Sequence, residues 1–244
     1  MASFKSFVKR LPLLPSVYKL ICSKYITHQL KTKDPERVFD ALYKLNAWSG
    51  KDSVSGTGSD AIQTSVIAKA LPSLFRDFDI STLLDIPCGD FHWMKSVDLS
   101  GIDYTGADIV NALIHQNAAQ HERPSVRFQK LDLIKDTLPQ VDLVFCRDCL
   151  VHLSFEDIFS ALNNLCKSQS KYLLTTTFTR DADNRDINTG EWRVLNLERA
   201  PFRLRKPLLL INEGCTESDN AYADKSLGLR RIADIRDDLT RRSA

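Results

Sequence analysis

The chain has 244 residues, of which 43% are hydrophobic and 26% charged, and its 33 Lys and Arg nearly balance its 31 Asp and Glu. These values are ordinary for a globular protein, and they exclude a chain that is disordered, collagenous or coiled-coil as a whole. At roughly 150 residues per domain, the length allows one large domain or two small ones.

Cysteine content and hydropathy bear on the compartment. Six cysteines without regular paired spacing are too sparse for a disulfide scaffold, and they favour a reducing compartment. No apolar run approaches the roughly 20 residues that are needed to cross a bilayer. We therefore expect a cytoplasmic protein.

Residues 1–33 differ from the rest in charge. They hold seven basic and no acidic side chains, whereas residues 34–244 hold 26 basic and 31 acidic ones. Apolar residues are interspersed with the basic ones, so we predict a basic amphipathic extension ahead of a folded domain at 34–244. Three interpretations of the extension stay open: packing on the domain or on a partner, peripheral contact with an anionic membrane, and a targeting segment.

The domain begins with two helical patterns. Asp34, Pro35 and Glu36 are typical of a helix start. Residues 62–75 also have helical spacing of apolar residues, and a loop of glycines and serines at 49–60 separates the two patterns. Strands and helices then alternate. We predict strands at 81–86, 102–107, 126–131, 141–146 and 172–178, helices from Asn111 and at 154–166, and two further strands at 194–197 and 208–211.

This alternation predicts an α/β fold with a doubly wound, Rossmann-like parallel sheet. Such sheets bind ligands beyond the carboxyl ends of their strands, where the strand order reverses. The first predicted strand leads into Gly89, and the second ends at Asp108, 19 residues later. A glycine lets the backbone approach a ligand closely, and a carboxylate can accept both hydroxyls of an adenosine ribose. Asp132 follows the third strand, beside apolar residues that suit the edge of an adenine.

The order of these strand-end residues resembles the class I S-adenosylmethionine (SAM)-dependent methyltransferases. More narrowly, the segments Asp85–Trp93, Arg147–Leu153 and Ser53–Ser59 resemble a little-characterised subgroup that is often found alongside glycan-building enzymes. The resemblance covers roughly residues 36–235. It implies a seven-stranded sheet, mostly parallel, with an antiparallel terminal hairpin, which residues 194–211 suit.

The resemblance also implies SAM as the cofactor. Asp85 would orient the first strand-end loop and the amino group of SAM. Gly89 would lie against the methionine part of SAM, and Asp108 would hold the ribose. Its remaining contacts would be Pro87, Ile109, Asp132, Leu133, Ser55 and Gly56. The loop at 53–59 has a second interpretation as a plain linker between helices.

The first strand-end loop departs from the family pattern at two positions. Pro87 and Phe91 stand where the family usually has glycines, and only Gly89 remains. This departure weakens a dinucleotide-binding interpretation, because G-x-G-x-x-G is needed to hold a pyrophosphate. It weakens the SAM-binding interpretation less, because SAM carries no phosphate.

Methyl transfer to a hydroxyl requires alignment of the two reactants and removal of a proton. Asp148 and His152, four residues apart, would share a helix face just after the fourth strand. His152 is a candidate general base, because its ordinary pKa lies near neutrality, or it braces the loop. Asp148 would hold His152, act as the base itself, or cap the next helix. Arg147 is either a clamp for the acceptor or a salt-bridge partner.

A polar segment at 180–192 follows the fifth strand and is predicted to bind the acceptor. It offers hydrogen-bonding groups and one aromatic face, a mixture that suits a sugar or glycan. The alternative interpretation of the segment is a solvated turn. The predicted acceptor contacts are Asn184, Asp186 and Trp192 in this segment and Arg193 directly after it. A divalent ion held by this segment and Asp148 is a weaker alternative, and we expect no metal.

The sequence supports SAM-dependent O-methylation of a sugar or other hydroxyl acceptor as its first hypothesis. A nicotinamide-dependent oxidoreductase and a non-catalytic cofactor-binding module are the alternatives. A nucleic-acid acceptor is not favoured, because residues 34–244 carry a net negative charge.

Overall fold

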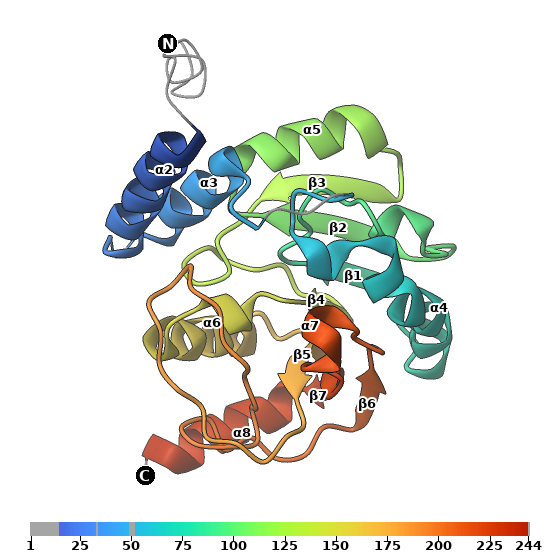
Figure 1. The fold of residues 1–244 in the computed structure, drawn as a ribbon. Coiled ribbons are helices and arrows are strands. Elements are labelled where there is room, and N and C mark those ends of the chain that lie inside the picture. Colours follow the sequence, from blue (N-terminus) through green and yellow to red (C-terminus); the bar gives the residue numbers. More distant parts are fainter. Residues whose placement is uncertain (1–14, 33, 49–51, 244) are drawn as a thin grey trace.

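The computed structural model describes residues 15–32, 34–48 and 52–243. Helices α2 (Pro15–Leu30) and α3 (Pro35–Leu45) pack against each other at one side of the molecule (Figure 1). The first 14 residues of the predicted basic extension lie outside the described residues, so its contact with a membrane and the domain boundary at residue 33 stay predictions. None of the described helices has the length and hydropathy that a membrane span requires.

Seven strands of the described chain form one sheet, in the order β3-β2-β1-β4-β5-β7-β6. The first five strands are parallel, and β7 runs antiparallel to both of its neighbours. The strands are β1 (Thr82–Asp85), β2 (Asp103–Asp108), β3 (Val126–Lys130), β4 (Leu143–Cys146), β5 (Tyr172–Phe178), β6 (Leu209–Asn212) and β7 (Lys225–Arg231). The predicted α/β fold with a mostly parallel sheet is confirmed.

Helices cover both faces of the sheet. Successive residues of its central strands point to opposite faces, and because these residues are apolar, both faces must be buried. Leu84 and Val144 belong to the core formed with α6 (Phe155–Lys167) and α8 (Ile232–Ser243). Leu83 and Leu143 belong to the core formed with α4 (Ala61–Asp77). α5 (Asn111–His121) packs on β2 and β3, above them in Figure 1.

The terminal hairpin contains one of its two predicted strands, because the strand predicted at 208–211 is β6 to within one residue. Residues 194–197 form no strand, and β6 pairs instead with β7, which we did not predict. The pattern at 194–197 arises because Leu195 and Leu197 are buried in the core beside the end of β5 without joining the ladder. β7 has a poor hydropathy signal, because it contains a glycine and buries the charged Lys225 and Arg230.

Candidate active site

A cavity of about 380 Å³ lies at the carboxyl ends of β1, β2, β4 and β5. β1 and β4 are neighbours in the sheet, while the chain moves from β1 toward one edge and from β4 toward the other. This is the switch point at which doubly wound sheets bind their ligands. The cavity size is in the range of small-molecule sites.

Gly89 and Asp108 lie side by side in one half of the cavity. The backbone N–H of Gly89 donates to Asp108 Oδ2 at 3.2 Å, and the N–H of Val110 donates to Oδ1 at 2.8 Å. Gly89 has a φ of +54°, and a Cβ there would lie 2.2 Å from Ser55 Oγ. The position therefore favours glycine both for its backbone conformation and for the close approach of the loop above it.

Asp85, Asp108 and Asp132 in this half are buried, and they form no ion pair with any described residue apart from a 3.7 Å contact of Asp132 with Lys135. Burial raises the pKa of Asp85 to about 7, although the Tyr104 hydroxyl donates to its Oδ2 at 2.6 Å. Burial also raises the pKa of Asp108 to about 6, against the opposing effect of its backbone N–H donors. Both carboxyls are thus poised to titrate near neutral pH.

The other residues that the sequence predicts for the cofactor also line the cavity. They are Pro87, Ile109, Asp132, Leu133, Ser55 and Gly56. Asp132 accepts from the backbone N–H of Ile134 at 2.8 Å, which fixes its carboxylate at the end of the loop. The structure therefore brings the whole predicted cofactor set into the lining of one cavity, while the role of each residue stays a prediction.

The loop at 53–59, here called the strap, folds across the cavity. At one end, Ser53 Oγ and the N–H of Val54 donate to the carboxylate of Asp90, at 2.9 and 3.0 Å. At the other end, Arg147 donates to the carbonyl of Gly58 at 2.8 Å. The strap therefore lines the cavity and is held at both of its ends, while its predicted contact with a cofactor stays a prediction.

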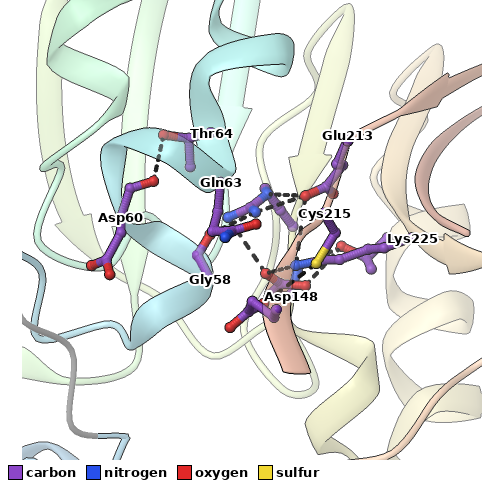
Figure 2. Close-up of polar contacts among 12 residues, drawn as sticks. Gly58, Asp60, Gln63, Thr64, Asp148, Glu213, Cys215 and Lys225 are labelled. Atoms are coloured by element: carbon purple, nitrogen blue, oxygen red, sulfur yellow. Dashed lines mark hydrogen bonds and ion pairs between the residues drawn. The ribbon is translucent and has the colours of Figure 1, made fainter. Parts of the chain in front are cut away.

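Asp148 stands in the other half of the cavity, after β4. Its Oδ2 lies 2.6 Å from Lys225 Nζ and 3.4 Å from Arg147. Although burial acts to raise it, these two cations hold the pKa of Asp148 well below its usual range. The carboxylate therefore stays ionised at neutral pH, which makes it a poor general base. Figure 2 shows this arrangement around Asp148 and Lys225.

The predicted helix face shared by Asp148 and His152 is wrong. Asp148 has a φ of +50°, and a single 3₁₀ turn spans Leu150–His152. His152 is instead held by its Nδ1, which lies 2.9 Å from the carbonyl oxygen of Glu191. Because a carbonyl only accepts, Nδ1 carries the proton of the neutral ring and Nε2 is left as the acceptor. Burial lowers the pKa of His152, so the neutral ring dominates at pH 7.

Only part of the predicted acceptor set reaches the cavity. Trp192 lines it, with its ring centroid 4.9 Å from that of Tyr222. Asn184 instead donates to the carbonyls of Asn196 and Ala200, and Asp186 accepts from the N–H of Phe155 at the start of α6. These two side chains brace their own loop and lie outside the cavity lining.

Two arginines of the predicted set act as internal partners. Arg193 is buried beside Phe155 and donates to the carbonyl of Val151 at 3.1 Å, away from the cavity lining. Arg147 lines the cavity but is committed to Glu213, with its terminal nitrogen 2.7 Å from Oε2. For Arg147 the structure has the salt-bridge alternative.

Sequence reasoning missed several lining residues because they come from distant segments. α3 and the turn after it contribute aromatic side chains. The segment before β7 contributes a tyrosine and a glutamate, and the first residue of β7 contributes a lysine. These residues are Phe39, Tyr43, Trp48, Glu217, Tyr222 and Lys225. The ring of Trp48 lies next to that of His152, with centroids 5.7 Å apart and the ring planes tilted by 55°. Among the described residues, no cluster of His, Cys, Asp and Glu could hold a metal ion.

Comparison with known proteins finds likeness in structure only. No family model matches the chain, and no curated protein matches its sequence. Human N-acetylserotonin methyltransferase, solved with SAM, is similar with a TM-score of 0.56 and 15% identity over 86% of this chain. This chain spans 66% of that protein, just under two-thirds of its length.

Two bacterial structures are similar over most of their own length. The N-methyltransferase NodS from Bradyrhizobium japonicum matches with a TM-score of 0.53 and 14% identity, over 71% of this chain and 98% of its own. The methyltransferase domain of bacterial CtHen1 matches with a TM-score of 0.50 and 10% identity, over 70% and 97%. The chain therefore has the fold of the class I SAM-dependent methyltransferases.

Proposed function

We propose that this protein is a SAM-dependent methyltransferase that acts on a hydroxyl group, with a sugar or glycan as the favoured acceptor. The observation that carries the proposal is the contact between the Gly89 turn and the Asp108 carboxylate inside the cavity at the switch point of the sheet. This carboxylate can hold a ribose, and Leu131 and Leu133 beside Asp132 offer apolar surface for an adenine.

The charges of this half also fit SAM. Asp85 and Asp108 are buried carboxyls that form no ion pair with a described residue, and burial raises the pKa of each. A cationic ligand would favour their ionised forms, and SAM is cationic at sulfur and nitrogen. A phosphate-bearing dinucleotide would instead meet unpaired acids at this wall, and the loop lacks the glycine pattern for a pyrophosphate.

When bound, SAM supplies a methyl group on a positively charged sulfur, which needs alignment more than activation. The chain supplies the means to take up the acceptor proton, because His152 lines the cavity and the Nε2 of its neutral ring is unprotonated. Asp148 stays ionised and would accept a hydrogen bond from an acceptor hydroxyl. Of the predicted pair, we therefore assign the base to His152.

The acceptor end of the cavity combines aromatic faces with polar groups. Trp48, Trp192 and Tyr222 line it near His152 and Asp148. Flat aromatic faces stack on the apolar side of a sugar ring, while carboxylates accept from its hydroxyls. NodS is named as an N-methyltransferase, so the choice of oxygen rests on this chain's own residues.

A labelled-methyl transfer assay tests the proposal. The protein is incubated with labelled SAM and a panel of free sugars, lipid-linked sugars and small phenols. We expect label in a hydroxyl-bearing product, and its loss with His152→Gln. His115→Gln is the matched control, because His115 is exposed on α5 outside the cavity lining. SAM binding without transfer to any acceptor would favour the non-catalytic alternative, and tighter binding of a nicotinamide cofactor would favour the oxidoreductase.

A further inference from the structure

Glu213 lies behind the wall of the cavity, at the start of the connection between β6 and β7. Its side chain is 1% exposed, and it is absent from the cavity lining. Its Oε2 accepts from Arg147 at 3.2 and 2.7 Å and lies 3.5 Å from Lys225 Nζ. Figure 2 shows Glu213 joined in this way to Lys225 and, through it, to Asp148.

Each cation that Glu213 holds has a second contact in the cavity wall. Arg147 donates to the Gly58 carbonyl of the strap at 2.8 Å, and Lys225 donates to Asp148 at 2.6 Å. These two carboxylates and two cations thus form a group with no net formal charge, in which Glu213, Arg147 and Lys225 are buried and Asp148 faces the cavity. One residue outside the cavity is therefore connected to both the strap and the acceptor wall.

The second oxygen of Glu213 shows why a carboxylate is present here. Glu213 Oε1 is buried and has no hydrogen-bond partner among the described residues. An unsatisfied buried oxygen is costly, so a side chain that served only to fill space or accept one hydrogen bond would not need it. The negative charge of Glu213 balances Arg147 and Lys225, which it pairs with at 2.7 and 3.5 Å.

We propose that Glu213 is a positioning residue, which holds Arg147 on the strap and Lys225 on Asp148 and thereby keeps the strap closed over the bound cofactor. This inference rests on the proposed function, because it assumes that the cavity binds SAM or its product. Without the charge of Glu213, the ion pair that remains to Arg147 among the described residues is the one with Asp148, 3.4 Å away. Its guanidinium would turn toward Asp148 and weaken its hold on Gly58.

The outer side of the strap is held more weakly. Thr57 Oγ1 donates to Glu217 Oε1 at 2.6 Å, and this hydrogen bond is exposed. Exposed hydrogen bonds contribute less to stability than buried hydrogen bonds to charged groups do. The strap is therefore expected to open from this side, with the contact of Arg147 as the main resistance.

The experiment measures the dissociation rate of S-adenosylhomocysteine by stopped-flow tryptophan fluorescence. We expect Glu213→Gln, which keeps the shape and removes the charge, to release it about 10-fold faster than the wild type. Thr57→Val should release it about 3-fold faster. Asp142→Asn is the matched control, because Asp142 is a buried, ion-paired carboxylate at the amino ends of β1 and β4, whereas the cavity lies at their carboxyl ends. It should lower Tm and leave the dissociation rate unchanged.

The outcomes separate this proposal from the proposed function. A wild-type protein that binds neither SAM nor S-adenosylhomocysteine overturns both. Binding by the wild type with equal rates in Glu213→Gln and the control overturns only the positioning role. If Glu213→Gln fails to fold, Arg147→Lys and Thr57→Val decide the question. Lysine keeps the charge but lacks the fork that reaches Glu213 and Gly58 together, so unchanged rates in both variants also overturn the proposal.

Discussion

Asp85 and Asp108, in the half of the cavity formed by β1 and β2, accept hydrogen bonds from Tyr104 and from backbone N–H groups, whereas Asp148, beside β4 and β7, is paired with two cations. Burial raises the pKa of the first two carboxyls, while Lys225 and Arg147 hold that of Asp148 down despite its burial. The same side-chain chemistry is thus tuned in opposite directions within one cavity.

This difference indicates that the half formed by β1 and β2 is the one suited to a positively charged ligand. Buried acids without a cationic partner are costly when ionised, and a cationic ligand removes that cost. The acceptor half already contains its own counter-charges, so it suits a neutral molecule with hydroxyl groups. Under the proposed function, the first half would hold the positively charged donor and the second an uncharged acceptor.

The largest effect should come from His152→Gln, which removes the side chain that we propose takes up the acceptor proton. We expect kcat to fall about 1000-fold with little change in the dissociation constant of SAM. In the wild type, kcat should fall as the pH drops through the pKa of His152, which lies below 6.5, because only the neutral ring accepts a proton. A full rate at low pH, or a strong loss of SAM affinity in the variant, would contradict this role.

Asp108→Ala should give the next largest effect, on the cofactor half. We expect SAM to bind about 100-fold more weakly by calorimetry, because the two hydrogen bonds of a ribose would lose their acceptor. Asp103→Ala on the same strand is the control, since Asp103 is exposed and pairs with Arg127. Tight binding by Asp108→Ala would refute the ribose assignment.

The pH dependence of binding separates the two halves more finely. With pKa values of about 7 and about 6, Asp85 and Asp108 become ionised as the pH rises, and ionised carboxylates attract the sulfonium. The affinity for SAM should therefore rise about 10-fold between about pH 5 and about pH 8. S-adenosylhomocysteine lacks the sulfonium charge and should show a weaker dependence. Equal pH dependence for both ligands would break the comparison.

The smallest effect concerns stability. The folded-state pKa of Asp85 is about 7 against an ordinary 3.8, so between these values the folded protein holds a proton that the unfolded chain has lost. Asp85 therefore lowers the free energy of unfolding as the pH rises through this window. Asp85→Asn removes this cost and keeps an oxygen for the Tyr104 hydroxyl. We expect Tm to rise by about 5 °C at about pH 8, measured by calorimetry, with no gain at about pH 4.

The parts of the fold that the sequence predicted have local causes. β5 was predicted at its observed bounds, and β1 to β4 and α6 to within a few residues, because a fully buried strand or an amphipathic helix shows itself in consecutive residues. The positions of Gly89 and Asp108 followed from the same logic, since the carboxyl ends of neighbouring parallel strands meet at one edge.

The acceptor side and the charged group behind it were decided by tertiary structure. Arg147, Glu213 and Lys225 are separated by many residues, and Lys225 belongs to a strand whose buried charges hide it from a hydropathy pattern. Asn184, Asp186 and Arg193 had the residue types of a binding loop, but in the structure they brace that loop or its surroundings. Periodicity reports which face of an element is buried, whereas the partner of a buried charge depends on which distant segment the closed fold places against it.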